Sequence, residues 1–290
     1  ASFITLRDVT FQNSPSHVLR FEDSEQIIID GIYIKNHRQS PNTDGIDLVD
    51  SKNVFISNSY IATGDDAICL KTDVDGIVEN VVVTNCILES DDAAIKFGTG
   101  SAGITRYCSF NNITIKNSRY GISLFMLEGG LFEFNSFTDI IINEGSRHKH
   151  EYPIFIDVDR KRPTDAYGII RNTRFSNLII NSGGKILING RPEQPIQGLA
   201  LQNIRFAVST ERDFSNATKP RGNKNFPKLP ESIDRAPVPA YFTLGYINDL
   251  HLSGSSIRTT SNAVRKDADL IGISNMIIYN NSGRDLATLK

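Results

Sequence analysis

The chain has 290 residues, of which 39% are hydrophobic and 22% are charged, a composition that is ordinary for a globular protein. Its formal net charge of −2 gives no electrostatic basis for binding nucleic acid or an anionic membrane, and no apolar run reaches the roughly 18 residues that a membrane span needs. The three cysteines form no C-x-x-C pair and have no zinc-type spacing, so neither a metal nor a cofactor is predicted.

A short alternation of apolar and polar residues recurs along the chain and ends each time on Asn, Asp or Gly. It appears over 4–8, 27–31, 54–58 and 81–85, and it predicts a short strand at each place. The spacing between the first six of these end markers is 23 residues once and then 27 residues four times. They are Asp8, Gly31, Asn58, Asn85, Asn112 and Asp139, and the later ones are Asn177, Asn203, Gly254 and Asn275.

A fixed period of this length indicates similar structural units stacked on one another. Because each unit alternates with period two, the units are built from strands, and the predicted fold class is all-β: a parallel β-helix forming a single domain over 1–290. The wider marker spacings predict insertions over 143–168 and 207–245. The alternative is a sandwich of antiparallel hairpins, but hairpin turns do not predict four equal steps of 27.

The same step identifies the inward and outward positions of one strand in each turn. Ile68, Ile95 and Ile122 are 27 residues apart, which predicts a column of side chains in the core. Strand alternation then turns the residues between the core positions outward. The predicted outer columns are Asp47, Cys69, Lys96 and Ser123, and beside them Val49, Lys71, Gly98 and Phe125.

Carboxylates gather directly before these strands. Asp44 aligns with Asp66, and Asp65 aligns with Asp92. Carboxylates on neighbouring turns, about 4.8 Å apart, repel each other, so at least one should have a raised pKa and keep its proton. A protonated carboxyl beside an ionised one is suited to acid/base cleavage of a glycosidic bond. Asp is also a common turn residue, so a structural role is the alternative for each position.

Two motifs among these residues resemble a known family. Asn42-Thr43-Asp44-Gly45, followed by Gly64-Asp65-Asp66, is similar to the signature of glycoside hydrolase family 28, the polygalacturonases and rhamnogalacturonan hydrolases, and 41–71 resembles its bacterial branch. The resemblance implies a single-stranded right-handed parallel β-helix of the pectin-lyase type and hydrolysis with inversion. It also implies that Asp66 is the general acid and that Asp44 and Asp65 activate water. For such an inverting pair we expect about 6.5–9.5 Å between acid and base carboxyls.

Further expectations follow from this resemblance. The substrate is expected to be an acidic pectic glycan, bound without cofactor or metal by a monomer that is secreted or periplasmic. Asp44, Asp65 and Asp66 are expected to share one open groove, with Asp92 at its edge. Because the chain begins directly in strand-like sequence, a mature chain and a piece lacking N-terminal coils both stay open.

The chain also departs from the family pattern. On the turn where the family has Gly-His-Gly, this sequence reads Asp91-Asp92-Ala93-Ala94-Ile95 and has no histidine, and where the family has Arg-Ile-Lys, this sequence reads Ser123-Leu124-Phe125. The cationic group that grips a substrate carboxylate is therefore missing from its usual place, and Lys96 is predicted to point toward Asp65 and Asp66 in its stead. The candidate substrate-binding residues are Asn42, Lys71, Asp92, Lys96, Tyr120, Tyr152, Arg160 and Arg191, with simple stacking as the alternative for the two tyrosines.

Two other functions fit the same residues. Clustered carboxylates can bind Ca²⁺, with Lys96 or Lys71 as the base of a polysaccharide lyase. The missing histidine and clamp also fit a catalytically impaired carbohydrate-binding β-helix. Fold alone does not separate these functions from hydrolysis.

Overall fold

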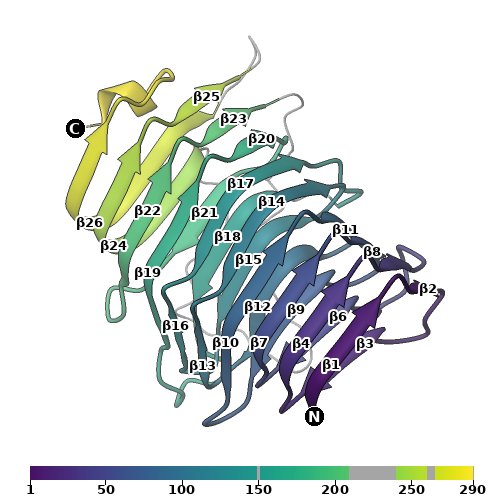
Figure 1. Cartoon of the computed structure of the whole chain (residues 1–290). Coiled ribbons are helices and arrows are strands. Elements are labelled where there is room, and N and C mark those ends of the chain that lie inside the picture. The colour runs from purple at the N-terminus through teal and green to yellow at the C-terminus, as the bar shows by residue number, and fades with distance from the viewer. Residues whose placement is uncertain (149–150, 209–239, 260–264, 290) are drawn as a thin grey trace.

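The protein is described here by a computed structural model, which places residues 1–148, 151–208, 240–259 and 265–289. Its strands stack as successive turns from the N-terminus to the C-terminus (Figure 1), and every strand pairing within these residues is parallel. The parallel β-helix predicted from the period is therefore confirmed, and the antiparallel sandwich is excluded. No helix in this part of the chain is long and apolar enough to cross a membrane.

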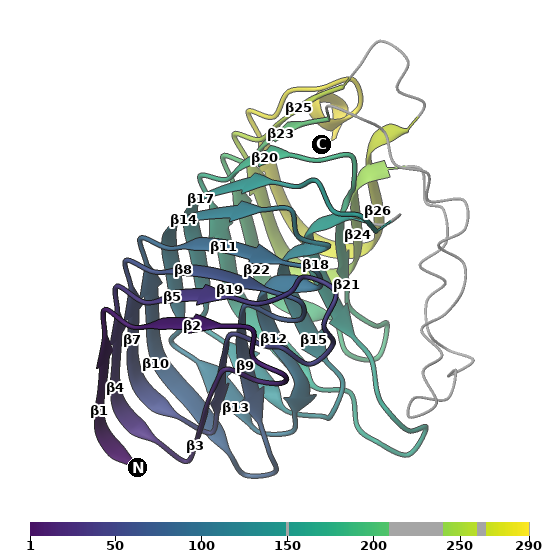
Figure 2. The same ribbon diagram turned by 90° about the vertical axis from the view of Figure 1, so that its right-hand side faces the viewer.

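Each turn of the β-helix contributes strands to three faces, which Figure 2 shows from the side. The first face consists of β3 (Leu19–Glu22), β6 (Ile46–Val49), β9 (Ile68–Thr72), β12 (Ala93–Ser101), β15 (Tyr120–Met126), β18 (Tyr152–Val158), β21 (Ile186–Asn189) and the first parts of β24 (Ala240–Ser253) and β26 (Lys266–Tyr279).

The second face continues from the first. It consists of β1 (Ser2–Arg7), β4 (Glu25–Asp30), β7 (Lys52–Ser57), β10 (Ile77–Thr84), β13 (Ile104–Arg106), β16 (Leu131–Glu133), β19 (Ile169–Ser176), β22 (Ile196–Gln202) and the later parts of β24 and β26.

The third face closes the coil. It consists of β2 (Thr10–Gln12), β5 (Tyr33–Lys35), β8 (Tyr60–Thr63), β11 (Ile87–Ser90), β20 (Ile179–Asn181), β23 (Arg205–Ala207) and β25 (Ser256–Arg258), while β14 (Ser109–Lys116) and β17 (Ser136–Asn143) run from the second face into it. A short 3-10 helix, η1 (Leu286–Thr288), follows the last strand.

The predicted core register is confirmed on the first face. Ile68 pairs with Ile95, and Ile95 pairs with Ile122, and all three side chains are fully buried. Aliphatic and aromatic side chains from all three faces join them in one continuous core. Because each turn repeats the same inward positions, burial of apolar surface, at about 25 cal/mol per Å², fixes the register of every neighbouring turn.

The marker residues form a ladder of left-handed turns. Asn58, Asn85 and Asn112 have φ of 52°, 56° and 50°, a conformation that Asn tolerates better than most residues. Their amides bond from turn to turn, with Asn85 donating to Asn58 over 3.2 Å and Asn112 donating to Asn85 over 2.8 Å. The ladder ends at Asn280 and not at Asn275 as predicted, because β24 pairs with β26 so that Ser253 lies beside Tyr279.

The two predicted insertions have different outcomes. The segment 143–168 is not one insertion, because β18 (Tyr152–Val158) lies inside it as a regular strand of the first face, with a loop on either side. Of the segment 207–245, residues 209–239 lie outside the described residues, and β24 begins at Ala240.

Candidate active site

The first face brings the predicted aspartates together. The register of β6 against β9, with Ile46 beside Ile68, places Asp44 next to Asp66 immediately before these strands. The register of β9 against β12, with Ile68 beside Ile95, places Asp92 next to Asp65 in the same way. The strands thus adopt both alignments predicted from the sequence, the 22-residue step from Asp44 to Asp66 and the 27-residue step from Asp65 to Asp92.

Asp66 and Lys96 form a buried ion pair at the centre of this cluster. The side chains are 2% and 10% exposed, and Lys96 Nζ donates to Asp66 Oδ2 over 2.6 Å. The other carboxylate oxygen, Oδ1, is buried with no hydrogen-bond partner among the described residues. Burial, with Asp92, Asp65 and Asp44 nearby, raises the pKa of Asp66 to about 7 although Lys96 opposes the shift. Asp66 can therefore hold a proton near neutral pH.

The lysine of this pair stays charged. Burial by itself would lower the pKa of Lys96, but the adjacent Asp66 carboxylate outweighs burial and raises it. Its ammonium also lies 5.6 Å from the centre of the Phe125 ring, a cation–π distance. Lys96 thus points toward Asp66 as predicted, but its hydrogen bond to Asp66 makes it a partner of the acid and leaves it poorly placed to grip a substrate.

Asp65 is held by the backbone. It accepts hydrogen bonds from the Asn42 N–H at Oδ2 and from the Asp66 N–H at Oδ1, each over 3.0 Å. Burial raises the pKa of Asp65, and the charges of Asp44 and Asp92 add to the effect. Asn42 thus contributes its backbone to the site and positions a carboxylate that the sequence identified.

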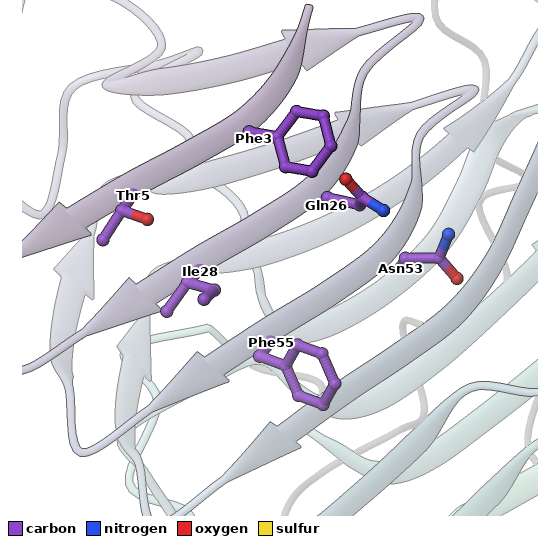
Figure 3. Close-up of a pocket in the computed structure, with 6 residues that line it drawn as sticks. All are labelled: Phe3, Thr5, Gln26, Ile28, Asn53 and Phe55. Atoms are coloured by element: carbon purple, nitrogen blue, oxygen red, sulfur yellow. The ribbon is translucent and has the colours of Figure 1, made fainter.

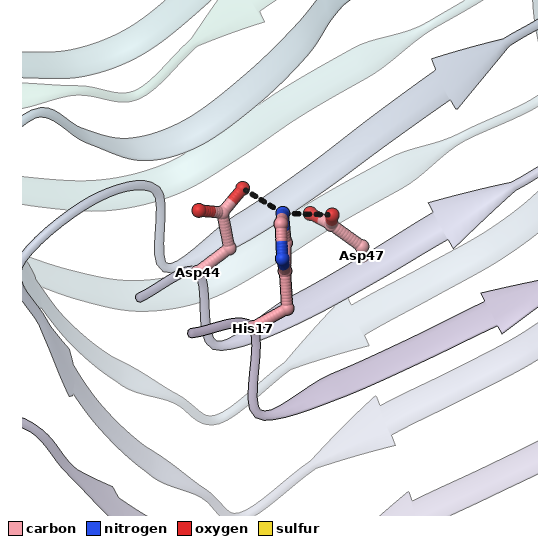
Figure 4. Close-up of side chains that lie close together, drawn as sticks. All are labelled: His17, Asp44 and Asp47. Atoms are coloured by element: carbon pink, nitrogen blue, oxygen red, sulfur yellow. Dashed lines mark ion pairs between the residues drawn. The ribbon is translucent and has the colours of Figure 1, made fainter. Parts of the chain in front are cut away.

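Asp44 belongs to a second charged group, with Asp47, Lys71 and His17. Lys71 Nζ lies 3.1 Å from Asp44 Oδ2 and 2.7 Å from Asp47 Oδ2. His17 Nε2 lies 3.8 Å from Asp44 Oδ2 and 3.4 Å from Asp47 Oδ2 (Figure 4). Burial raises the pKa of Asp44, and Asp47 adds to the shift, whereas Lys71 and His17 lower it.

One prediction about the aspartates is corrected. Asp66 has a carboxylate oxygen within 4.8 Å of one of Asp44 and within 4.8 Å of one of Asp65, so the three are close neighbours, and the carboxyl separation of an inverting pair stays a prediction. The three also do not line an open groove, since Asp44 and Asp66 are only 4% and 2% exposed. The reason is that the ammonium groups of Lys71 and Lys96 lie against these two carboxylates.

The aspartates nevertheless lie outside the hydrophobic core. Alternation in β12 puts Ile95 and Phe97 inside and leaves Lys96 on the outer surface, where it meets Asp66. The cluster of aspartates therefore faces the same side as the predicted outer columns. Asp92 lies at its edge, where its carboxylate pairs with Arg119 over 3.3 Å.

Several predicted binding residues have structural contacts instead. Tyr120 and Tyr152 are 3% and 5% exposed and stack on each other with ring centres 5.4 Å apart, which supports the stacking alternative. Arg191 is 2% exposed, pairs with Asp159 over 2.9 Å and donates to a backbone carbonyl, so it has no surface to offer a polymer. Arg160 lies over the Tyr167 ring, with its guanidinium 4.7 Å from the ring centre.

Sequence reasoning missed two residues at the site, His17 and Arg119. Both obey the 27-residue step: 27 residues separate His17 from Asp44, and 27 separate Asp92 from Arg119. Extending the two aligned columns by one turn in each direction would have found them. Arg119 also lies over the Tyr120 ring at 5.0 Å, and burial of its Nε leaves that nitrogen without a partner in the described part of the chain.

A pocket of about 350 Å³ lies elsewhere, on the second face near the N-terminus (Figure 3). It is lined by Phe3, Thr5, Gln26, Ile28, Asn53 and Phe55, which come from β1, β4 and β7. None of these side chains titrates, so the pocket holds no acid/base group. The chemistry of the described residues is therefore carried by the aspartate cluster.

The raised pKa of Asp66 predicts that stability falls as pH rises. Its pKa of about 7 in the folded chain lies above the ordinary value of 3.8, so the folded state holds the proton more tightly. That contribution is fully present below the ordinary value and is lost as pH rises through about 7. We expect the urea midpoint to be higher at pH 5 than at pH 8, and Asp66→Asn to reduce the difference. An unchanged pH dependence in Asp66→Asn would contradict the assignment.

Comparison with known proteins gives this geometry a context. Residues 2–77 match the sequence model of "Glycosyl hydrolases family 28". A polygalacturonase of Chamaecyparis obtusa is 43% identical over 74 residues, which are 26% of this chain and 14% of that protein. An endo-polygalacturonase of Pectobacterium carotovorum subsp. carotovorum is 40% identical over 67 residues, which are 23% of this chain and 17% of that protein. The chain thus matches less than a fifth of the length of these relatives.

Solved structures extend the likeness in fold. An exopolygalacturonase of Thermotoga maritima superposes with a TM-score of 0.63 at 21% identity, over 71% of this chain and 48% of that one. A family 28 exopolygalacturonase of Yersinia enterocolitica superposes with a TM-score of 0.62 at 12% identity, over 95% of this chain and 46% of that one. Plant and bacterial relatives both match, so the bacterial branch stays a prediction. Over residues 2–77 the chain is thus similar in sequence to glycoside hydrolase family 28, and its parallel β-helix is similar in fold to solved exopolygalacturonases.

Proposed function

We propose that this chain hydrolyses glycosidic bonds of a pectin-type polysaccharide by acid/base catalysis at Asp44, Asp65 and Asp66. The observation that carries the proposal is the state of Asp66, a carboxyl whose burial raises its pKa to about 7 while carboxylates of Asp44 and Asp65 lie close by. All three fall within the residues that match family 28 and its polygalacturonases. The polymeric substrate supports, as part of the proposal, a secreted or periplasmic enzyme.

In the proposed reaction, Asp66 gives its proton to the glycosidic oxygen of the leaving sugar. Asp65 and Asp44 take the proton of a water that attacks the anomeric carbon, so the C–O bond breaks as the new one forms. Asp65 suits this role because two backbone N–H groups fix its carboxylate. Inversion rests on the resemblance alone; the anomer formed first, followed by proton NMR, decides it.

The substrate side is where the chain differs from its relatives. The match to family 28 ends at residue 77, before the positions of the missing histidine and of the missing Arg-Ile-Lys. At the latter, Phe125 is 1% exposed and packs with Tyr120 and Phe155 in an aromatic cluster. The missing histidine and the missing clamp favour a second candidate function, a carbohydrate-binding β-helix without turnover.

One assay separates the candidates. The chain is incubated with polygalacturonate, methyl-esterified pectin and rhamnogalacturonan, and both reducing ends and ultraviolet absorbance are followed. New reducing ends without an absorbing unsaturated product, unchanged by EDTA, support hydrolysis. Absorbance that EDTA abolishes identifies a calcium-dependent lyase, and binding with neither signal identifies the binding module.

Arg119 is expected to recognise the acidic substrate in place of the missing clamp. Its side chain is 28% exposed, and its guanidinium contacts Asp92 at the edge of the cluster. Asp92 itself lies one turn beyond Asp65. An Arg can bind a uronate carboxylate through charge-assisted hydrogen bonds. We expect Arg119→Ala to raise KM for polygalacturonate about tenfold, the loss of about 1.4 kcal/mol, with little change for methyl-esterified pectin.

The control for Arg119 is Arg106→Ala, which removes an arginine paired with Glu79 on the second face. Equal losses on acidic and esterified substrate in Arg119→Ala would show that the residue supports the fold and does not read the carboxylate. Steady-state kinetics on both polymers give the comparison.

A further inference from the structure

His17 is brought to the site by the turn that precedes Asp44. The register of β3 against β6 pairs Leu19 with Ile46, and continuing it by two residues places His17 beside Asp44. Figure 4 shows the imidazole between the carboxylates of Asp44 and Asp47, with Nε2 toward both. The other ring nitrogen, Nδ1, lies 3.2 Å from Ser16 Oγ. The ring is thus fixed at both nitrogens while its side chain stays 33% exposed.

The two carboxylates beside this imidazole also contact other cations. The Asp47 carboxylate is in contact with Lys71 at 2.7 Å and with Arg20 at 3.4 Å, yet its Oδ1 is buried without a hydrogen-bond partner in the described part of the chain. Asp44 has Lys71 as its nearer cation, at 3.1 Å, and His17 as its second. The negative charge of Asp44 in turn raises the pKa of Asp65 and of Asp66.

His17 belongs to a column of equivalent positions that runs on to the turn where the family histidine is missing. His17, Asp44, Asp66 and Ala93 occupy equivalent places on four successive turns. The resemblance places a histidine on the turn after the paired aspartates, where residues 91–95 contain none. Here an imidazole lies at the other end of this column, beside Asp44.

We propose that His17 is a positioning residue that keeps the Asp44 carboxylate ionised and oriented for activating water, so that activity extends further toward acidic pH. The expected effect on activity rests on the proposed hydrolysis, whereas the expected effect on the Asp44 carboxylate rests on the contacts of His17 alone.

The physical reason is electrostatic, because the charge of His17 lowers the pKa of Asp44. A positive ring 3.8 Å from Asp44 Oδ2 favours the carboxylate form, so it opposes the rise in the Asp44 pKa that burial and Asp47 cause. Without it Asp44 would take up a proton at higher pH, and the acid limb of the pH–rate profile would move up.

The test compares His17→Gln with the parent chain and with His17→Arg, which keeps a fixed positive charge. For His17→Gln we expect the acid limb of kcat/KM to move up by about half to one pH unit, so that activity well below the limb falls about three- to tenfold. Activity at the optimum should change much less. His17→Arg should keep the acid limb near that of the parent chain. His251→Gln, a change on the second face beside Tyr279, is the matched control.

A second readout does not need turnover. Carboxyl carbon NMR, with Asp44 assigned through Asp44→Asn, follows its titration directly in the parent chain and in His17→Gln. A move of that titration to higher pH in His17→Gln supports the inference even if no pectin is hydrolysed. An unmoved Asp44 titration overturns it, and so does an unmoved acid limb in an active, folded His17→Gln chain. An inactive parent chain with a displaced titration overturns the proposed hydrolysis alone.

Discussion

Asp66→Asn should reduce kcat/KM on the best pectic substrate by about 10²- to 10⁴-fold, the usual contribution of a general acid. Asn has nearly the same shape as Asp but cannot give a proton to the leaving oxygen. The effect should hold across the pH range, because the amide that replaces the carboxyl does not titrate between pH 4 and pH 9. Initial rates of reducing-end formation, measured from pH 4 to pH 9, provide the number.

The control for this change is Asp92→Asn, which lies at the edge of the cluster and pairs with Arg119. It removes a negative charge from the same face without touching the proposed acid, so we expect a loss of less than about tenfold, a transition-state effect of about 1.4 kcal/mol. An Asp66→Asn chain that folds and keeps more than a tenth of the parent activity would show that the proton comes from another group.

The second large effect concerns stability. Lys96→Met should lower the free energy of unfolding at pH 8 by about 3–5 kcal/mol, because it leaves the Asp66 carboxylate buried and unpaired. At pH 5 the loss should be much smaller, since removing Lys96 raises the pKa of Asp66 further and the carboxyl then takes up a proton. Urea denaturation of both chains at the two pH values measures the difference.

Two further variants make this expectation specific. The double change Asp66→Asn with Lys96→Met removes both charges, so at pH 8 it should be more stable than Lys96→Met alone while remaining inactive. Lys116→Met removes a lysine of the third face that is 37% exposed and lies 3.4 Å from Glu89, a surface pair of at most about 1 kcal/mol. Equal losses in Lys96→Met at pH 5 and pH 8 would contradict a buried ion pair.

The sequence alone determined the architecture and the alignment of the acidic residues. The 27-residue spacing predicted the stacked turns and the neighbours Asp65–Asp92, and the similarity of 44–49 to 66–71 predicted the neighbours Asp44–Asp66; the strand registers confirm both. The physical reason is that each turn buries the same inward positions, so a slip by one residue would turn apolar side chains outward. The repeat length therefore determines the strand register, and the register determines which residues of successive turns lie side by side.

Only the tertiary structure decided what each polar side chain contacts. A column says which residues are neighbours, but long side chains reach across columns: Lys96 turns to Asp66, Lys71 turns to Asp44 and Asp47, and Arg191 turns inward to Asp159. Burial likewise depends on these rotamers, since the cations that cover Asp44 and Asp66 close the groove that was expected to be open. The raised pKa of Asp66 results from that burial, and the alternation of inward and outward residues in the sequence does not predict it.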